Sequence, residues 1–454
     1  MAELLFDIEE LPERNPCRTE AASHVGQPRL RIPVRDQVEF RSASLEELLP
    51  PNHEARLVWE AVCRLDLSPW LSEVKAVEGH VGRNATDPRL LVALWVYATL
   101  QGEGSAREIA RLCTCHAAYQ WLCGGVPLNH HTLGDFRSQG GEKWDALLSE
   151  LVGGLMAAEL VTLQCVAQDG MRVRANAGKS SFRREATLEH CLAQAQQQVE
   201  TLKRLAEENP DELDRRKRAA RERAAREREE RIEEALANRK QLEAEREKRA
   251  KTTGEPAKEA RASTTDPQAR HMKFANGGYA PGYNTQFMTD THSGIIVGVE
   301  VTNAGSDGQE LPPMLDQVRE RYEQDPASAL VDGGFASKEA ITDAAENHGC
   351  TVYAPLKEVE KQLAKGTDPY AKKKGDTPAV AAWRERMGTV AAKALYKLRA
   401  QTAEWVNAQC RNHGLWQMPV RGQAKCRIVA LLYAISHNLM QTLNLHAKAA
   451  KMTT

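Results

Sequence analysis

Val166-Ala-Gln-Asp-Gly-Met-Arg-Val-Arg-Ala-Asn-Ala177 is the stretch from which the fold and the chemistry of this chain can be predicted. It has the pattern of a strand that carries one acidic side chain, Asp169, to a turn at Gly170. A basic segment with Arg172, Arg174 and Asn176 follows at once. A carboxylate at a strand end beside arginines suits a metal ion held next to a nucleic-acid phosphate.

A second acidic strand end lies far downstream, in Ala329-Leu-Val-Asp-Gly-Gly-Phe335, where Asp332 precedes two glycines. Either stretch alone fits an ordinary Asp-Gly turn. The two together, with a glutamate on a C-terminal helix, favour one shared site. Asp290 and Asp307 are rival acids, but neither ends a buried central strand.

The composition bounds the class of protein. A chain of 454 residues holds two or three domains, and 61 Lys and Arg balance 62 Asp and Glu, so any DNA-binding surface must come from local clustering. The ten cysteines are scattered, and the close pair Cys113 and Cys115 lacks zinc-site spacing. No run reaches the ~18 apolar residues that span a membrane, and no signal peptide is recognisable, so we expect reduced thiols in cytoplasm.

The N-terminal third is predicted to be helical. Residues 1–43 are proline-rich and are expected to form a flexible arm. Residues 44–160 show helical periodicity with capping signals such as Ser105 with Glu108, and Asp87-Pro88. Several short helices separated by tight turns suit a helix-turn-helix-like DNA-binding domain, and a plain helical bundle is the alternative.

Residues 184–262 are predicted to be a charged helical insertion with its linker. Leu188, Leu192, Ala195 and Val199 step by four and three, as in a coiled-coil seam. From Asp211 to Ala250, 14 Lys and Arg alternate with 12 Asp and Glu. The insertion is interpreted either as a solvated spacer or as an arm that contacts DNA or a second subunit.

The segments on either side of the insertion, residues 161–183 and 263–445, are predicted to form one α/β domain, and 446–454 a tail. Strand, hairpin, helix, strand, helix and strand follow in the order of an RNase H-like mixed sheet. The elements after the first strand are a hairpin of 282–290 with 294–302, a helix over 309–323, a strand over 328–332, a helix over 338–347 and a strand over 351–355.

The C-terminal region adds the third acid. A helix is predicted from Val390 to Arg411, and Glu404 lies on it, five residues after Arg399. A last apolar helix is predicted over 428–443, shortly after Arg421.

These residues together resemble a bacterial insertion-sequence transposase of the DDE class. The resemblance is carried by Gln168–Asn176, Gly282–Gln286, Val331–Phe335 and Tyr396–Arg411, and the helical region resembles the N-terminal domain of the same group. It implies that Asp169, Asp332 and Glu404 are the catalytic metal-binding triad for two Mg²⁺ or Mn²⁺ ions. It also implies DNA contacts. These are expected from Arg172, Arg174, Asn176, Tyr396, Arg399, Arg411 and Arg421.

One departure from the family pattern concerns the end of this helix. Tyr396, Arg399 and Glu404 match the Tyr-Arg-Glu signature, in which a Lys often follows about six residues later. Here Cys410 stands at six residues and Arg411 at seven.

The resemblance implies a transposase that binds terminal inverted repeats, then cleaves DNA and transfers strands by two-metal-ion chemistry. Its partners would be double-stranded DNA of the transposon ends and the target, and a second copy or more of the chain, in a nucleoid-associated bacterial cytoplasmic protein. A catalytically silent DNA-binding or scaffold protein and a stand-alone RNase H-like nuclease are the alternatives.

Overall fold

A computed structural model describes residues 44–77, 79, 84–208, 212–254 and 259–452. The expected N-terminal arm, residues 1–43, lies outside the described residues. Within the described part, no helix combines the length and the apolar character that crossing a membrane requires.

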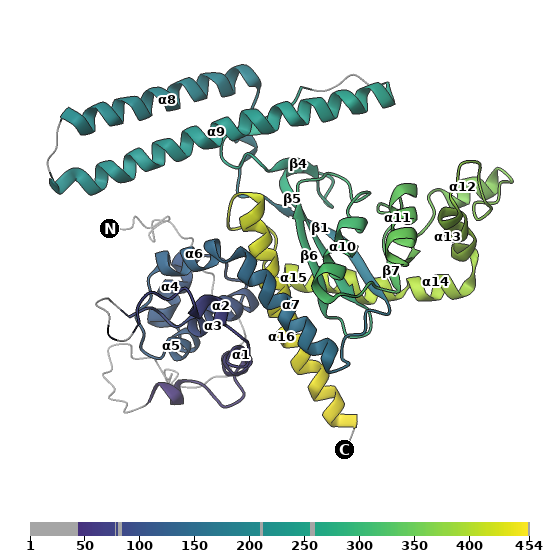
Figure 1. The fold of residues 1–454 in the computed structure, drawn as a ribbon, viewed down its shortest axis with the longest axis horizontal. Coiled ribbons are helices and arrows are strands. Elements are labelled where there is room, and N and C mark those ends of the chain that lie inside the picture. The colour runs from purple at the N-terminus through teal and green to yellow at the C-terminus, as the bar shows by residue number, and fades with distance from the viewer. Residues whose placement is uncertain (1–43, 78, 80–83, 209–211, 255–258, 453–454) are drawn as a thin grey trace, which may run out of the picture. The chain divides into compact units, whose positions relative to one another are not determined.

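A mixed sheet forms the centre of the C-terminal half (Figure 1). The neighbours run β4-β5-β1-β7-β8, and β6 also pairs with β5. β5 and β6 form the predicted hairpin, and β4 is an additional edge strand. The strands are β1 (Val166–Arg174), β4 (Arg270–Lys273), β5 (Tyr279–Asp290), β6 (Ile296–Thr302), β7 (Ser328–Leu330) and β8 (Thr351–Tyr353).

The direction of the strands matches the RNase H-like prediction. β5 is antiparallel to β1 and to β6, whereas β7 is parallel to β1 and β8 is parallel to β7. The parallel strands are joined through helices α10 (Leu311–Tyr322) and α11 (Lys338–His348). The predicted α/β fold with an RNase H-like mixed sheet is therefore confirmed.

The N-terminal region is helical, as predicted. Its central helix, α3 (Pro88–Leu100), is buried at every position except Arg89, so it is surrounded by other helices rather than amphipathic. The described part of the chain begins with a 3-10 turn, Leu45–Leu48. The other helices are α1 (Glu54–Val62), α2 (Ser68–Leu71), α4 (Ala106–Cys115), α5 (Ala117–Cys123), α6 (His130–Gln139) and α7 (Gly141–Ala157).

The last helix, α16 (Gln423–Met452), is longer than predicted and lies between the helical region and the sheet (Figure 1). It packs on α3, α7 and β6. Its buried Asn438 hydrogen-bonds both backbone groups of Ile296 in β6, accepting at 2.8 Å and donating at 2.8 Å. This contact fixes the helix against the sheet, because an unpaired buried amide would be costly.

The charged insertion forms two helices that lie side by side, α8 (Glu185–Glu208) and α9 (Glu212–Thr253) (Figure 1). Leu188 of the predicted seam is buried against Ala235 of α9. The short strands β2 (Phe182–Arg183) and β3 (Ala262–Ser263) pair where the insertion leaves and rejoins the chain. Most charges of α9 remain exposed, as its poor apolar seam predicts.

The C-terminal helix predicted from Val390 to Arg411 is interrupted, which corrects that prediction. α14 (Val390–Tyr396) is followed by a π turn, Ala400–Glu404, and then by α15 (Trp405–Asn412). Upstream, two further helices, α12 (Val359–Ala364) and α13 (Pro378–Gly388), follow β8. Trp383 of α13 donates to the carbonyl of Ala354 after β8, at 3.1 Å.

Candidate active site

Asp169 lies in the middle of β1 rather than at its end. The strand continues through Gly170 to Arg174, so the turn expected at Gly170 does not exist. Pairing with β5 along the whole of β1, including Asp169 opposite Phe287, holds the backbone extended through this point. The sequence signal was ambiguous because Asp-Gly is common in turns and glycine is uncommon within strands.

The Asp169 carboxylate has three partners. Its Oδ1 forms an ion pair with Nη2 of Arg399 at 2.9 Å and accepts from the backbone N–H of Gly170 at 3.0 Å. Its Oδ2 accepts from Nδ2 of Asn407 at 2.9 Å. Burial raises the pKa of this carboxyl, the charge of Arg399 opposes that rise, and the negative charge of Asp332 adds to it. A buried acid with a raised pKa and a specific partner is typical of functional sites.

Glu404 is brought to the same guanidinium by the π turn. Arg399 and Glu404 are five residues apart, and five residues is the repeat of π-helical hydrogen bonding. Nη1 of Arg399 donates to Oε1 of Glu404 at 2.7 Å. Arg399 therefore lies between the carboxylates of Asp169 and Glu404, one from a strand and one from a helix. Single π turns of this kind occur frequently at functional sites.

Asp332 approaches from the neighbouring strand. β7 is parallel to β1 with Ala167 opposite Leu330, and continuing this register by two residues sets Asp332 opposite Asp169. Neighbouring strands lie about 4.8 Å apart. The backbone N–H of Gly334 donates to Oδ1 of Asp332. A Cβ at Gly334 would lie 2.7 Å from that oxygen, so a side chain there would disturb this contact.

Tyr396 belongs to the same group of side chains. Burial raises the pKa of its hydroxyl, Arg399 lowers it, and the charges of Asp332 and Glu404 raise it further. Tyr396 thus lies within the electrostatic field of the acidic residues. The segment from Tyr396 to Glu404 gathers the predicted Tyr-Arg-Glu signature on one side of β1.

The basic residues that follow Asp169 lie elsewhere. Side chains alternate along a strand, so Arg172 and Arg174 project from the face opposite to Asp169. Arg172 donates to the carbonyls of Lys273 at 3.2 Å and Gly305 at 3.1 Å. The alternation was readable in the sequence, so their separation from Asp169 could have been predicted.

A second group forms where β1 meets the segment that precedes α16. Nε of Arg421 donates to the carbonyl of Asn176 at 3.2 Å, and Nδ2 of Asn176 donates to the carbonyl of Pro419 at 3.4 Å. The guanidinium of Arg411 lies over the ring of Trp416, 5.8 Å from its centroid. Trp416 is 63% exposed. Arg411 therefore lies beside an exposed aromatic side chain, and Arg421 and Asn176 contact backbone carbonyls of this region rather than the carboxylates.

Asn407 is the residue that the sequence reasoning missed. Its side chain is buried and donates to Asp169, which fixes the orientation of that carboxylate. It lies three residues after Glu404, on the same side of α15, and this spacing was the available signal. The rival acid Asp290 does end a buried strand, β5, which corrects the expectation, but its carboxylate accepts from the N–H and hydroxyl of Ser293, at 2.9 and 2.7 Å, within the hairpin turn.

The donor set suits a hard divalent cation. Among the described residues, no three His, Cys, Asp or Glu side chains are gathered closely enough to hold a metal ion. Asp169 and Glu404 nevertheless both pair with one cationic group, the guanidinium of Arg399. The two carboxylates therefore create a position that attracts positive charge. Carboxylate oxygens are the ligands that Mg²⁺ prefers.

The fold places the chain in the RNase H-like class, and two comparisons with known families agree with this placement. The description "Transposase DDE domain" matches residues 248–439. The description "Transposase domain (DUF772)" matches residues 43–139. The chain belongs to the insertion-sequence transposases of the DDE class. No match was found among curated proteins or among solved structures.

Replacing Asp169 with Asn should remove a pH dependence of stability. Because burial raises the pKa of Asp169, the folded chain binds this proton more tightly than the unfolded chain does. The free energy of unfolding of the wild type should therefore fall relative to that of the variant as pH rises from about 4, the usual pKa of Asp, through the raised value. Chemical unfolding of both proteins across this range, with EDTA present, measures the difference. A difference that stays constant with pH would contradict the prediction.

Proposed function

We propose that this transposase binds the ends of an insertion sequence, cleaves the DNA there and joins the ends to target DNA. Asp169, Asp332 and Glu404 would hold two Mg²⁺ or Mn²⁺ ions. The observation that carries the proposal is the arrangement of carboxylates from β1, the end of β7 and the π turn around Arg399. When bound, a pair of divalent ions activates the attacking oxygen and stabilises the leaving oxygen of a phosphodiester.

The chain's own residues prepare this site in three ways. Asn407 and the N–H of Gly334 orient the carboxylates of Asp169 and Asp332. Arg399 balances the charges of Asp169 and Glu404, which would otherwise repel each other in a partly buried site. Tyr396 and Arg399 lie beside these carboxylates. They would therefore face the DNA phosphate that is cleaved at the metal ions. No side chain is required as a nucleophile, so no covalent protein–DNA intermediate is expected.

We propose that the three regions of the chain have separate functions. Residues 44–160 would recognise DNA, 161–183 with 263–445 would carry out catalysis, and 184–262 would be an inserted arm. Arg107 and Arg111 of α4 are exposed, although Arg111 forms an ion pair with Glu108 at 2.5 Å, so Arg107 is the side chain more readily available to DNA. Arg137 is not, because it is buried over the ring of Trp95, 4.2 Å from its centroid. Base contacts are therefore expected from α4 and not from the end of α6.

The second group of basic residues extends this proposal to the DNA backbone. The backbone N–H of Arg174 donates to the carbonyl of the exposed Trp416 at 3.1 Å, and the guanidinium of Arg411 lies over its ring, an arrangement that suits phosphates and an unstacked base. Cutting two ends and joining them to a target needs more than one active site, so a homodimer or higher oligomer on double-stranded DNA is the expected assembly.

The test is cleavage of the DNA that flanks the coding region in its genome. Purified protein is incubated with a labelled duplex containing one flank, with Mg²⁺ or with EDTA, and the products are separated on a denaturing gel. We expect cuts at one position that require Mg²⁺. Binding without any cleavage would favour a silent DNA-binding protein. Cleavage of any RNA–DNA hybrid without preference for the flanks would favour a stand-alone nuclease.

A further inference from the structure

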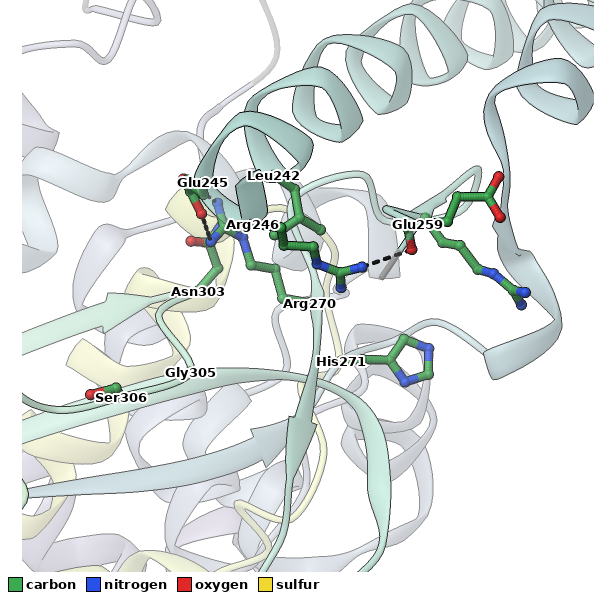
Figure 2. Close-up of a pocket in the computed structure, with 10 residues that line it drawn as sticks. Leu242, Glu245, Arg246, Glu259, Arg270, His271, Asn303, Gly305 and Ser306 are labelled. Carbon is green, nitrogen blue, oxygen red and sulfur yellow. Dashed lines mark hydrogen bonds and ion pairs between the residues drawn. The ribbon is translucent and has the colours of Figure 1, made fainter. Parts of the chain in front are cut away.

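A cavity of about 640 Å³ lies between the C-terminal part of α9 and the edge of the sheet (Figure 2). α9 contributes Glu245 and Arg246, and β4 contributes Arg270 and His271. Arg261, which precedes β3, also lines it. The cavity lies outside the proposed active site and is formed only because the insertion packs against the sheet edge.

The cavity gathers more positive charge than its acids balance. Glu245 pairs with Arg270 at 2.8 Å, and the carboxylate of Glu259 pairs with Arg184 at 2.9 Å. Arg246 donates to the backbone carbonyl of Glu259 at 2.7 Å. Arg261 is exposed and has no side-chain partner among the described residues. One guanidinium in the cavity is therefore available to an anion.

The pKa values of two of these side chains are lowered by burial and, to a smaller extent, by neighbouring cations. Burial lowers the pKa of Arg246 most, and the charge of Arg270 lowers it further. Burial also lowers the pKa of His271, followed by the charges of Lys179, Arg246 and Arg261. An anion bound among these residues would relieve this repulsion.

The shape and the position of the cavity favour one kind of anion. Guanidinium groups match the oxygens of a phosphate in a bidentate manner. The loop that lines the cavity contains Gly305, whose carbonyl accepts from Arg172 of the central strand β1 at 3.1 Å, so a further guanidinium, itself 3.9 Å from Asp307, lies beside the cavity. Several neighbouring cations suit a phosphodiester chain better than an isolated small anion.

We propose that this cavity binds a backbone phosphate of the DNA on which the transposase acts, with Arg261 as the side chain that contacts it. The proposal rests on the proposed function. It gives the helical insertion a role, because α9 forms one wall of the cavity.

The test is the salt dependence of DNA binding by Arg261→Ala. Fluorescence anisotropy with a labelled flank duplex gives the dissociation constant at several salt concentrations. Loss of one phosphate contact should weaken binding about tenfold and make the slope of log K against log salt shallower by about 0.9. Arg261 has no partner to lose, so the variant should fold, and its thermal unfolding verifies this.

Lys240→Ala is the matched control. Lys240 is exposed on α9 and has no side-chain partner among the described residues. It carries the same charge as Arg261. Successive residues of a helix are rotated by about 100°, so Lys240 and Leu242, two residues apart, point in directions that differ by roughly 160°. Leu242 lines the cavity, and Lys240 therefore points away from it. Its affinity and slope should equal those of the wild type.

Two outcomes would overturn the proposal. If wild type binds and cleaves the flank duplex while Arg261→Ala has the slope of Lys240→Ala, the cavity does not contact DNA, although the proposed function stands. If inorganic phosphate raises the unfolding temperature of the wild type and not of Arg261→Ala, with no difference in DNA slope, the cavity takes a free anion. Failure of the wild type itself to bind or cleave would contradict the proposed function.

Discussion

Asp332→Asn is expected to abolish Mg²⁺-dependent cleavage of the flank DNA and to leave DNA binding unchanged. Asn keeps the volume and one carbonyl oxygen of Asp but removes its charge, and a hard divalent cation prefers carboxylate oxygen. Because a direct ligand is lost, cleavage should fall by more than the about 10–100-fold typical of outer-shell changes at metal sites. DNA binding rests on basic side chains elsewhere, so its affinity should not fall.

The two measurements are denaturing-gel cleavage and gel-shift affinity at one salt concentration. Asp316→Asn is the matched control, because Asp316 is exposed on α10 and its two contacts, with Arg319 at 3.5 Å and with His348 at 3.4 Å, are long ion pairs of small energy. It should cleave and bind as the wild type does. Cleavage by Asp332→Asn near the wild-type rate would remove Asp332 from the metal site. Loss of DNA binding would show that recognition and chemistry share residues that we assign to separate regions.

Five of the six strands of the sheet could be predicted from local sequence patterns, whereas β4 and the continuation of β1 past Gly170 could not. The hairpin signal in 282–302 and the paired acidic stretches around Asp169 and Asp332 set the order of the sheet. The parallel register then follows from the match of Ala167 with Leu330, which no single stretch reveals. Pairing between distant strands is a property of the whole fold, and for this reason the sequence suggested a shared site without giving its geometry.

The details around the carboxylates were harder to predict. A five-residue spacing between Arg399 and Glu404 does not fit a regular α-helix, yet the π turn brings them together at 2.7 Å. Tertiary contacts with Asp169 accompany that turn, and local propensity does not encode them. In the same way, the burial of Arg137 over Trp95 depends on packing between helices that are separate in the sequence.

Gly170 is the other residue whose role the sequence obscures. Its neighbours on that face of the sheet are the buried amides of Asn284 and Gln286, which donate to Oδ1 of Asp307 at 2.6 and 2.9 Å. A Cβ at Gly170 would lie 2.5 Å from that oxygen, 2.5 Å from Nε2 of Gln286 and 2.8 Å from Oδ1 of Asn284. The glycine thus makes room for a hydrogen-bonded group rather than for a turn.

Gly170→Ala should therefore destabilise the protein by about 1–3 kcal/mol, the usual cost of overpacking a filled interior. Either the strand must shift, or the amides of Asn284 and Gln286 must lose their shared acceptor, Asp307. Both changes would displace Asp169, which is adjacent to Gly170 in the strand. Cleavage should consequently fall with stability, whereas DNA binding should persist below the unfolding transition. Chemical unfolding gives the free energy, and the flank assay gives the activity.

Gly154→Ala serves as the control for this prediction, and a double variant tests whether a steric clash is the cause. Gly154 lies exposed in α7 with no atom within 4 Å of a built Cβ, so alanine there should stabilise the helix by up to about 1 kcal/mol. Asp307→Ala removes one of the atoms that a new methyl group would meet, although it leaves two buried amides without their acceptor. If the clash is the cause, Gly170→Ala and Asp307→Ala together should cost less than the sum of the two single changes. Strictly additive costs would mean that the methyl group is accommodated without touching Asp307, and that the glycine is there for another reason.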